Sequence, residues 1–140
     1  MLFLFLDGFG LAPAGPDNPL SSVPMPHLAR LLSGPLVLET VAGLAGDDGL
    51  VLRAVDACLG VPGLPQSATG QTSLFTGVNA AALLGEHVTA HPTARLREVI
   101  AEHSILKRAV EAGKRAFFAN AHSERFWEMV REGKRRLAAW

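Results

Sequence analysis

A short hydroxyl-rich stretch carries the residue types best suited to nucleophilic chemistry. Residues 67–72 are Ser-Ala-Thr-Gly-Gln-Thr and follow a loop rich in proline and glycine. A hydroxyl just before a helix faces unpaired N–H groups and the positive end of the helix dipole, which together bind anions. A serine alcohol is a poor nucleophile at neutral pH, but a bound divalent cation can orient and activate it for attack on phosphorus. The alternative is an ordinary helix cap formed by Ser67 or Thr69.

Asp7 is the second residue that suggests chemistry. It follows the apolar run of residues 2–6 and lies between that run and the glycines at positions 8 and 10. Ligands gather outside the carboxyl ends of strands in open α/β sheets, so a carboxylate at this point is well placed to hold a metal. The alternative is a plain Asp-Gly turn with no ligand.

The histidines and the cysteine offer less. His87 and His91 have the i,i+4 spacing that brings two imidazoles together on a helix, but Pro92 follows at once, which favours a solvated loop. The other histidines are expected to be structural, with His103 in the core and His122 at a turn. Cys58 is the single cysteine, so an internal disulfide is excluded, and a buried apolar role is expected for it.

The elements that must position these residues alternate between apolar runs and amphipathic segments. Strands are expected at residues 2–6, 36–41, 50–55 and 114–120, with a turn at 46–49. Helices are expected at residues 26–32, 72–76, 94–112 and 123–137. This alternation predicts an α/β protein, a layered α/β/α fold with a mainly parallel sheet, in a single domain spanning residues 1–140.

Composition limits the function classes. The 140 residues suit one domain, and a hydrophobic share of 49% excludes intrinsic disorder. Seven acids and two bases up to residue 90 give −5, and six acids and eleven bases after it give +5, so the net charge is zero. The chain as a whole therefore has no basic excess that would favour binding to nucleic acid. Its short basic cluster at residues 134–136, with Trp127 and Trp140 nearby, leaves an RNA-contacting protein as a third alternative. The N-terminal apolar run is too short for a signal peptide or a membrane span, which predicts a cytoplasmic protein.

Four segments, taken together, resemble a known family. They are LFLDGFG at residues 4–10, Asn-Pro at 18–19, PHLARLL at 26–32 and GLPQSATGQTSLFTG at 63–77. Their order resembles the N-terminal part of the alkaline phosphatase superfamily, in the branch of the cofactor-independent phosphoglycerate mutases and phosphopentomutases. The resemblance covers about residues 2–80 and implies that Asp7 is a metal ligand. It further implies that Ser67 is both metal ligand and phosphorylated nucleophile, with Thr69 as the fallback.

The resemblance also implies cofactors and substrate contacts. It implies a divalent metal, Mn or Zn, with two ions in the complete family site, and a phosphorylated small-molecule substrate. Gln71, where the mutases have histidine, and Asn79 are the expected substrate-binding residues. The family completes its metal site with later Asp and His residues, whereas this sequence has no Asp after Asp56. The chain is therefore expected to be an incomplete half of a larger alkaline phosphatase-like fold, which is inactive alone.

Two further expectations follow from an incomplete fold. An open sheet edge favours self-association with a second copy of the chain. The alternative to an enzyme is a non-catalytic module that retains the fold and binds a phosphorylated ligand or a partner chain.

Overall fold

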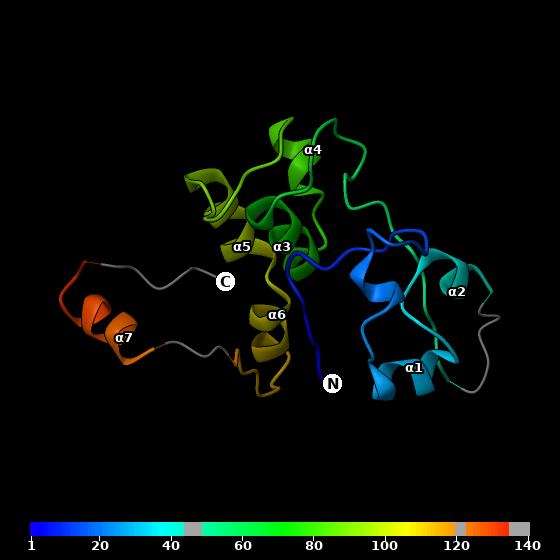
Figure 1. Cartoon of the computed structure of the whole chain (residues 1–140). Helices are drawn as coiled ribbons and strands as arrows, with labels where there is room; N and C mark the ends of the chain where they lie inside the picture. Colours follow the sequence, from blue (N-terminus) through cyan, green and yellow to red (C-terminus); the bar gives the residue numbers. More distant parts are fainter. Residues whose placement is uncertain (44–48, 120–122, 135–140) are drawn as a thin grey trace. The chain divides into compact units, whose positions relative to one another are not determined.

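The protein is helical in the part of the chain that the structure describes. The computed structural model describes residues 1–43, 49–119 and 123–134, and the chain divides into two compact units, Met1–Asp56 and Ala57–Trp140. The first unit contains η1 (Pro19–Ser21), α1 (Pro26–Leu32) and α2 (Leu38–Gly43). The second contains α3 (Ser67–Thr76), α4 (Ala80–Leu84), α5 (Ala94–His103), α6 (Ile105–Glu111) and α7 (Glu124–Arg131) (Figure 1). Division into units does not test whether both fold as one domain, so that prediction stays open.

The predicted sheet is wrong. Helices account for 44% of the described residues, and none of these residues forms a strand. Residues 2–6, 50–55 and 114–119 have no regular secondary structure, and residues 38–41 of the second predicted strand lie in α2. A strand is stable only when its backbone pairs with a neighbour, and an apolar run in the sequence does not supply that neighbour. The layered α/β/α fold, and with it the half of an alkaline phosphatase-like fold, is therefore not what residues 1–43, 49–119 and 123–134 form.

The side chains of the first predicted strand also differ from expectation. A strand covered on both faces would bury its residues, yet Leu2 is 91% exposed and Leu4 is 77% exposed. Self-association of the chain remains a prediction, but the open sheet edge that motivated it is absent from the described residues.

Helix α2 replaces the second predicted strand through contacts with an earlier loop. The Leu38 N–H donates to the carbonyl oxygen of Ala12 at 3.1 Å. The Glu39 carboxylate accepts hydrogen bonds from the Ala14 N–H at 3.0 and 3.2 Å. An acidic residue in the first turn also suits the helix dipole. Local tertiary contacts therefore override the strand propensity of this stretch.

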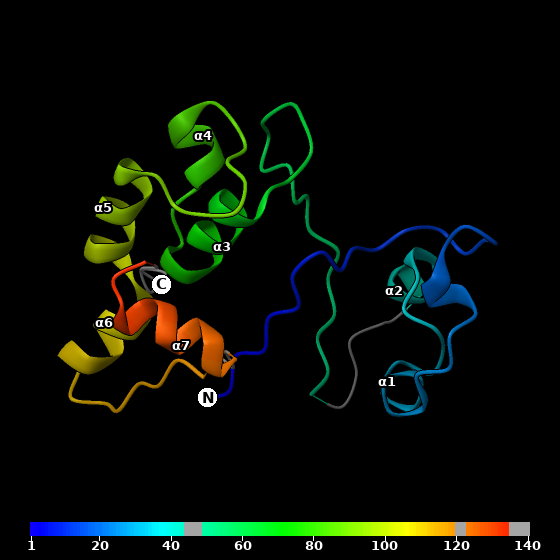
Figure 2. The same ribbon diagram turned by 60° about the vertical axis from the view of Figure 1, so that its left-hand side comes forward.

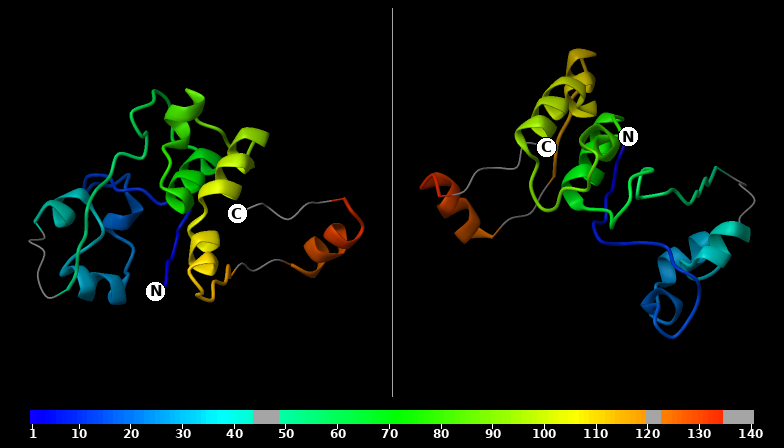
Figure 3. Two further views of the ribbon diagram at one scale, coloured as in Figure 1. Left: turned by 180° about the vertical axis from the view of Figure 1, so that it is seen from behind. Right: turned by 90° about the horizontal axis from the view of Figure 1, so that it is seen from above.

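The predicted helices are largely present, with different bounds. Helix α1 spans the predicted residues and has proline at its start. The helix predicted at 94–112 is two helices, because Ser104 adopts φ −52° and ψ 129° and caps α6 by accepting a hydrogen bond from the Leu106 N–H at 3.3 Å. Figure 3 shows the break between α5 and α6. Helix α3 begins five residues earlier than predicted. The turn at 46–49, His122 and the end of the helix predicted at 123–137 fall wholly or partly outside the described residues.

Helix α3 is the centre of packing in the second unit. It contacts α4, α5 and α6 (Figure 2). Ala68, Ala80 and Leu96 form the fully buried core, with Leu84 and Val88 packed against it. Small alanine side chains on α3 and α4 allow these two helices to approach closely, and Leu96 of α5 fills the remaining space. The helix that begins with Ser67 is therefore held on several sides.

A helix that spans a membrane must be both long and apolar. Among the described residues, no helix is both long and apolar enough to traverse a bilayer.

Candidate functional site

The start of α3 differs from an ordinary serine or threonine cap. The N-cap residue is Gln66, which has extended backbone angles of φ −129° and ψ 152° and makes no side-chain capping hydrogen bond. Ser67 is the first helical residue and is half-buried. The alternative in which Ser67 or Thr69 caps the helix is therefore wrong, and Ser67 lies inside the first turn.

The first N–H groups of α3 are occupied by a backbone carbonyl. The Val88 carbonyl oxygen accepts hydrogen bonds from the N–H groups of Ala68 at 3.0 Å and Thr69 at 3.4 Å. A carbonyl carries partial negative charge, so it fills the position in which an anion would bind a helix start. The expected anion site at these two groups is therefore closed in this structure.

Thr69 links the same segment to α3 through its side chain. Its hydroxyl donates to the Gln66 carbonyl oxygen at 3.3 Å and accepts from the Val88 N–H at 3.3 Å. Thr69 is fully buried, with 0% exposure. Of the two candidate nucleophiles, Ser67 is therefore the one whose residue reaches the surface, while the fallback, Thr69, holds the 88–89 segment against the helix.

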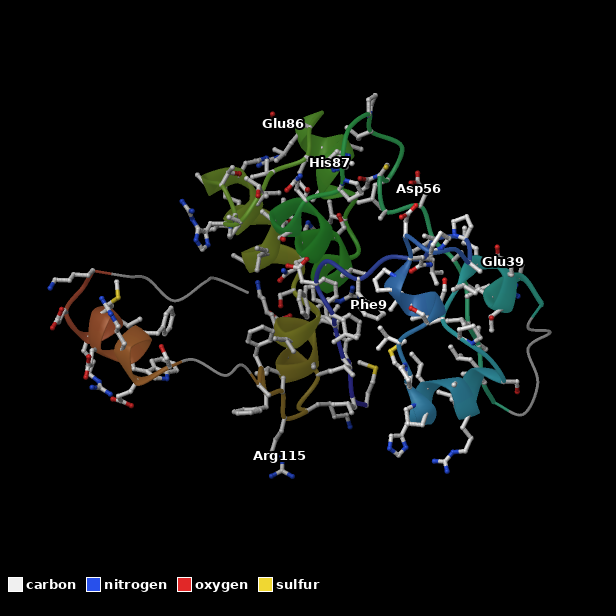
Figure 4. All side chains as sticks on the ribbon, viewed as in Figure 1. Phe9, Glu39, Asp56, Glu86, His87 and Arg115 are labelled. Carbon is white, nitrogen blue, oxygen red and sulfur yellow. The ribbon has the colours of Figure 1, made fainter. Side chains whose placement is uncertain are left out.

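A polar cleft lies beside the start of α3. Its volume is about 520 Å³, and two segments line it, the loop before α3 and the loop after α4. The lining residues are Pro62, Gly63, Leu64, Gln66, Gly85, Glu86, His87 and Thr89. Gln66 directly precedes Ser67, so the predicted nucleophile adjoins the cleft. Figure 4 shows Glu86 and His87 on the segment that follows α4.

The sequence predicts that His87 lies in a solvated loop, whereas the structure shows it partly buried and in contact with a backbone carbonyl. Its side chain is half-buried, and its Nε2 lies 3.1 Å from the Val61 carbonyl oxygen. Gly85, with φ 74°, ends α4 in the left-handed conformation that favours glycine, and this turn directs the chain back toward α3. The Leu-Leu-Gly sequence at the end of α4 is the signal that could have indicated this turn.

Asp7 belongs to the first unit and Ser67 to the second, and each is described within its own unit. Asp7 is exposed and forms a turn with Gly8, whose φ is 71°. The turn agrees with the alternative interpretation of this segment and leaves the metal role of Asp7 as a prediction. The predicted convergence of Asp7 and Ser67 on a shared cation also stays a prediction.

The described residues do not fit the two-metal centre that the resemblance implies. No group of three or more His, Cys, Asp or Glu side chains among residues 1–43, 49–119 and 123–134 is arranged to hold an ion. Two ions need about six ligands to hold them against water, and Asp7 with Ser67 supplies two. We therefore derive no chemical step through a Mn or Zn ion.

The two expected substrate-binding residues lie in different settings. Gln71 is half-buried on α3. Asn79 caps α4, since its Oδ1 accepts from the Ala82 N–H at 3.0 Å, while its Nδ2 donates to the Leu59 carbonyl oxygen at 2.9 Å. Both polar atoms of the Asn79 side chain thus serve the fold, and contact with substrate remains a prediction for both residues.

Cys58 and His103 are less buried than expected. Cys58 is half-buried, and its Sγ lies 3.5 Å from the Gly63 carbonyl oxygen. The His103 side chain is 45% exposed, and its Nε2 lies 3.6 Å from a Glu102 carboxylate oxygen. The helix break at Ser104 places His103 at the end of α5 rather than in the middle of a longer buried stripe.

Some of the basic residues after position 90 are paired with acids in the part of the chain that the structure describes. Arg95 contacts Glu98 at 2.8 Å, and Arg131 contacts Glu124 at 3.0 Å. Such exposed pairs are typical of a solvated helix face. Arg135 and Arg136 of the basic cluster lie outside the described residues.

Comparison of the chain with protein-family models, with curated proteins and with solved structures finds no match. The resemblance to the alkaline phosphatase superfamily therefore rests on the four segments quoted above.

Proposed function

We propose that this chain is a phosphoryl-transfer protein of the phosphatase or phosphomutase type, in which Ser67 accepts the phosphoryl group of a phosphorylated small molecule. The observation that supports this most is the position of Ser67, the first residue of α3 and the direct neighbour of the cleft-lining Gln66. A need for Mn or Zn, and a cytoplasmic location, are parts of the proposal that come from the sequence.

The packing of α3 suits this role. Ala68, Thr69 and Thr72 are fully buried and fix the helix in the second unit. The Cα–Cβ bonds of a helix tilt toward its N-terminus, so the Ser67 side chain leans toward the loop that lines the cleft. A nucleophile held by a rigid element loses little orientational freedom when substrate binds, which lowers the entropic cost of reaction.

Mass spectrometry of the chain after incubation with p-nitrophenyl phosphate tests the proposal. We expect one phosphoryl group on Ser67 in the presence of Mn or Zn, and none on that position in Ser67→Ala. Ser22→Ala, which changes a serine of the first unit, is the matched control and should be phosphorylated like the parent. Arms with a chelator measure the metal requirement. Equal phosphorylation of Ser67→Ala and the parent would remove Ser67 as the acceptor.

A second candidate is a non-catalytic module that binds a phosphorylated ligand or a partner chain. One observation favours it: among the residues that the structure describes, no group of His, Cys, Asp or Glu side chains is arranged to hold a metal ion. Binding of a phosphorylated ligand that is equal in Ser67→Ala and the parent, without any phosphoserine, would support this candidate over the enzyme.

A further inference from the structure

The orientation of the His87 ring is determined by a backbone carbonyl. A carbonyl oxygen only accepts hydrogen bonds, so the His87 Nε2 that lies 3.1 Å from the Val61 oxygen carries the proton. In the neutral ring the lone pair is then on Nδ1. Nδ1 has no hydrogen-bond partner among the residues that the structure describes. The ring is therefore oriented by one nitrogen and able to accept a proton at the other.

Ser67 and His87 are brought close by the hydrogen bonds of Val88. The Ala68 N–H donates to the Val88 carbonyl oxygen at 3.0 Å. Ser67 directly precedes Ala68, and His87 directly precedes Val88, so each candidate is one residue from the bonded pair. Consecutive Cα atoms are about 3.8 Å apart, which places both residues within the same small region. The bond from the Val88 N–H to the Thr69 hydroxyl holds the two segments together at a second point.

We propose that His87 is the proton acceptor for Ser67, and that the two form a nucleophilic pair that works without a metal ion. This rests on one part of the proposed function, Ser67 as the nucleophile, and it replaces the Mn or Zn requirement, which came from the sequence alone. A nucleophile, a base and a group that orients the base are the usual parts of such a site, and here the Val61 carbonyl is the orienting group. His87 would activate Ser67 in place of a metal ion, since the described residues contain no cluster of side chains that could hold one.

With a phosphate ester as substrate, the reaction begins at the Ser67 hydroxyl. The Ser67 Oγ attacks phosphorus, and the Oγ–P bond forms while its proton passes to His87 Nδ1. The bond from phosphorus to the leaving oxygen breaks, and the imidazolium returns the proton to that oxygen. The products are phosphoserine and an alcohol, and His87 is again neutral. Glu86 is the other titratable residue in the lining of the cleft.

A fluorophosphonate probe, applied with a chelator present, tests the pair directly. The Ser67 Oγ forms a bond to phosphorus, fluoride leaves, and His87 takes the proton, so the adduct reports activation without metal. We expect a stable adduct on Ser67, located by mass spectrometry. His87→Gln places an amide N–H near Nε2 for the Val61 carbonyl but lacks a basic nitrogen, so the labelling rate should fall by about 100-fold or more.

Two further variants separate a chemical role from a structural one. His91→Gln changes an exposed histidine outside the lining and should be labelled at the parent rate. His87→Ala should recover labelling when imidazole is added, which a purely structural role would not produce. Absence of an Ser67 adduct in the parent, parent-rate labelling of His87→Gln, or failure of imidazole to rescue His87→Ala would each overturn the pair.

The outcomes also distinguish this inference from the proposed function. Metal-dependent phosphoserine at position 67 in His87→Gln, with no loss of rate, would keep the proposed function and reject His87 as the base. Probe labelling that depends on His87, without phosphoserine from any phosphate ester tried, would keep the pair and reject phosphoryl transfer.

Discussion

Replacement of Thr69 by valine tests how the 88–89 segment is held on α3. Valine has the same shape as threonine but lacks the hydroxyl, so the change removes the bonds to the Gln66 carbonyl and from the Val88 N–H, both 3.3 Å long. An ordinary hydrogen bond contributes about 0.5–1.5 kcal/mol, and a donor left unpaired away from water costs about 1–3 kcal/mol. Because both bonds are long, we expect the free energy of unfolding to fall by about 2 kcal/mol.

The same helix contains a matched control. Thr72 is also fully buried, and its hydroxyl donates to the Ala68 carbonyl oxygen at 2.7 Å. That carbonyl still accepts the helical N–H four residues later, so Thr72→Val leaves no backbone group unpaired and should cost less than about 1 kcal/mol. Urea unfolding followed by far-ultraviolet circular dichroism measures both values. An equal loss in the two variants, or a larger loss for Thr72→Val, would refute the role assigned to Thr69.

Two substitutions in the second unit are expected to change the free energy of unfolding in opposite directions. Asn79→Ala removes the cap of α4 and the bond to the Leu59 carbonyl, so the free energy of unfolding should fall by about 1–2 kcal/mol in urea titrations. Ala90→Gly should raise the free energy of unfolding by up to about 1 kcal/mol, which would be seen as a higher Tm. Ala90 has φ 60°, and this left-handed conformation costs about 1–2 kcal/mol for a residue with a Cβ atom. The greater entropy loss of glycine on folding offsets part of that gain.

Each of these has its own control. Asn79→Asp keeps the capping oxygen and should lose less stability than Asn79→Ala, and equal losses would contradict the assigned cap. Ala101→Gly changes an exposed position within α5 and should lower the Tm, since glycine is unfavourable in a helix. If Ala90→Gly also lowered the Tm, residue 90 would not be in the left-handed conformation in solution.

Local sequence signals predicted part of the helical fold, whereas α2 was predicted as a strand and α4 was not predicted. Proline at the start of α1 and glycine after α3 and α4 act within a few residues, so they mark helix ends regardless of what packs against them. Ser104 shows the limit of such signals. The amphipathic pattern continues past it, yet its side chain caps a new helix and the predicted long helix becomes two.

The sheet could not be predicted reliably because strand pairing is not local. Residues 2–6 and 114–119 have the apolar composition of buried strands, but composition does not show whether a partner strand exists. In the structure Phe118 instead packs edge-on against Phe75 of α3, with ring centroids 5.9 Å apart. An aromatic contact with a helix is thus found in a segment where backbone pairing was expected.

The sequence by itself indicated a hydroxyl-rich segment beside the start of a helix, with Ser67 and Thr69 as its two candidate nucleophiles, but it placed the helix start at residue 72 rather than 67. Only the tertiary structure shows how the surroundings of the two residues differ. The segment at Val88, nineteen residues from Thr69, covers the Thr69 hydroxyl, and the Val88 carbonyl accepts hydrogen bonds from two N–H groups at the start of α3. The same contact brings His87 next to the start of α3. Hydrogen bonds between segments this far apart depend on how α3, α4 and the loops pack, which no local pattern of residues encodes.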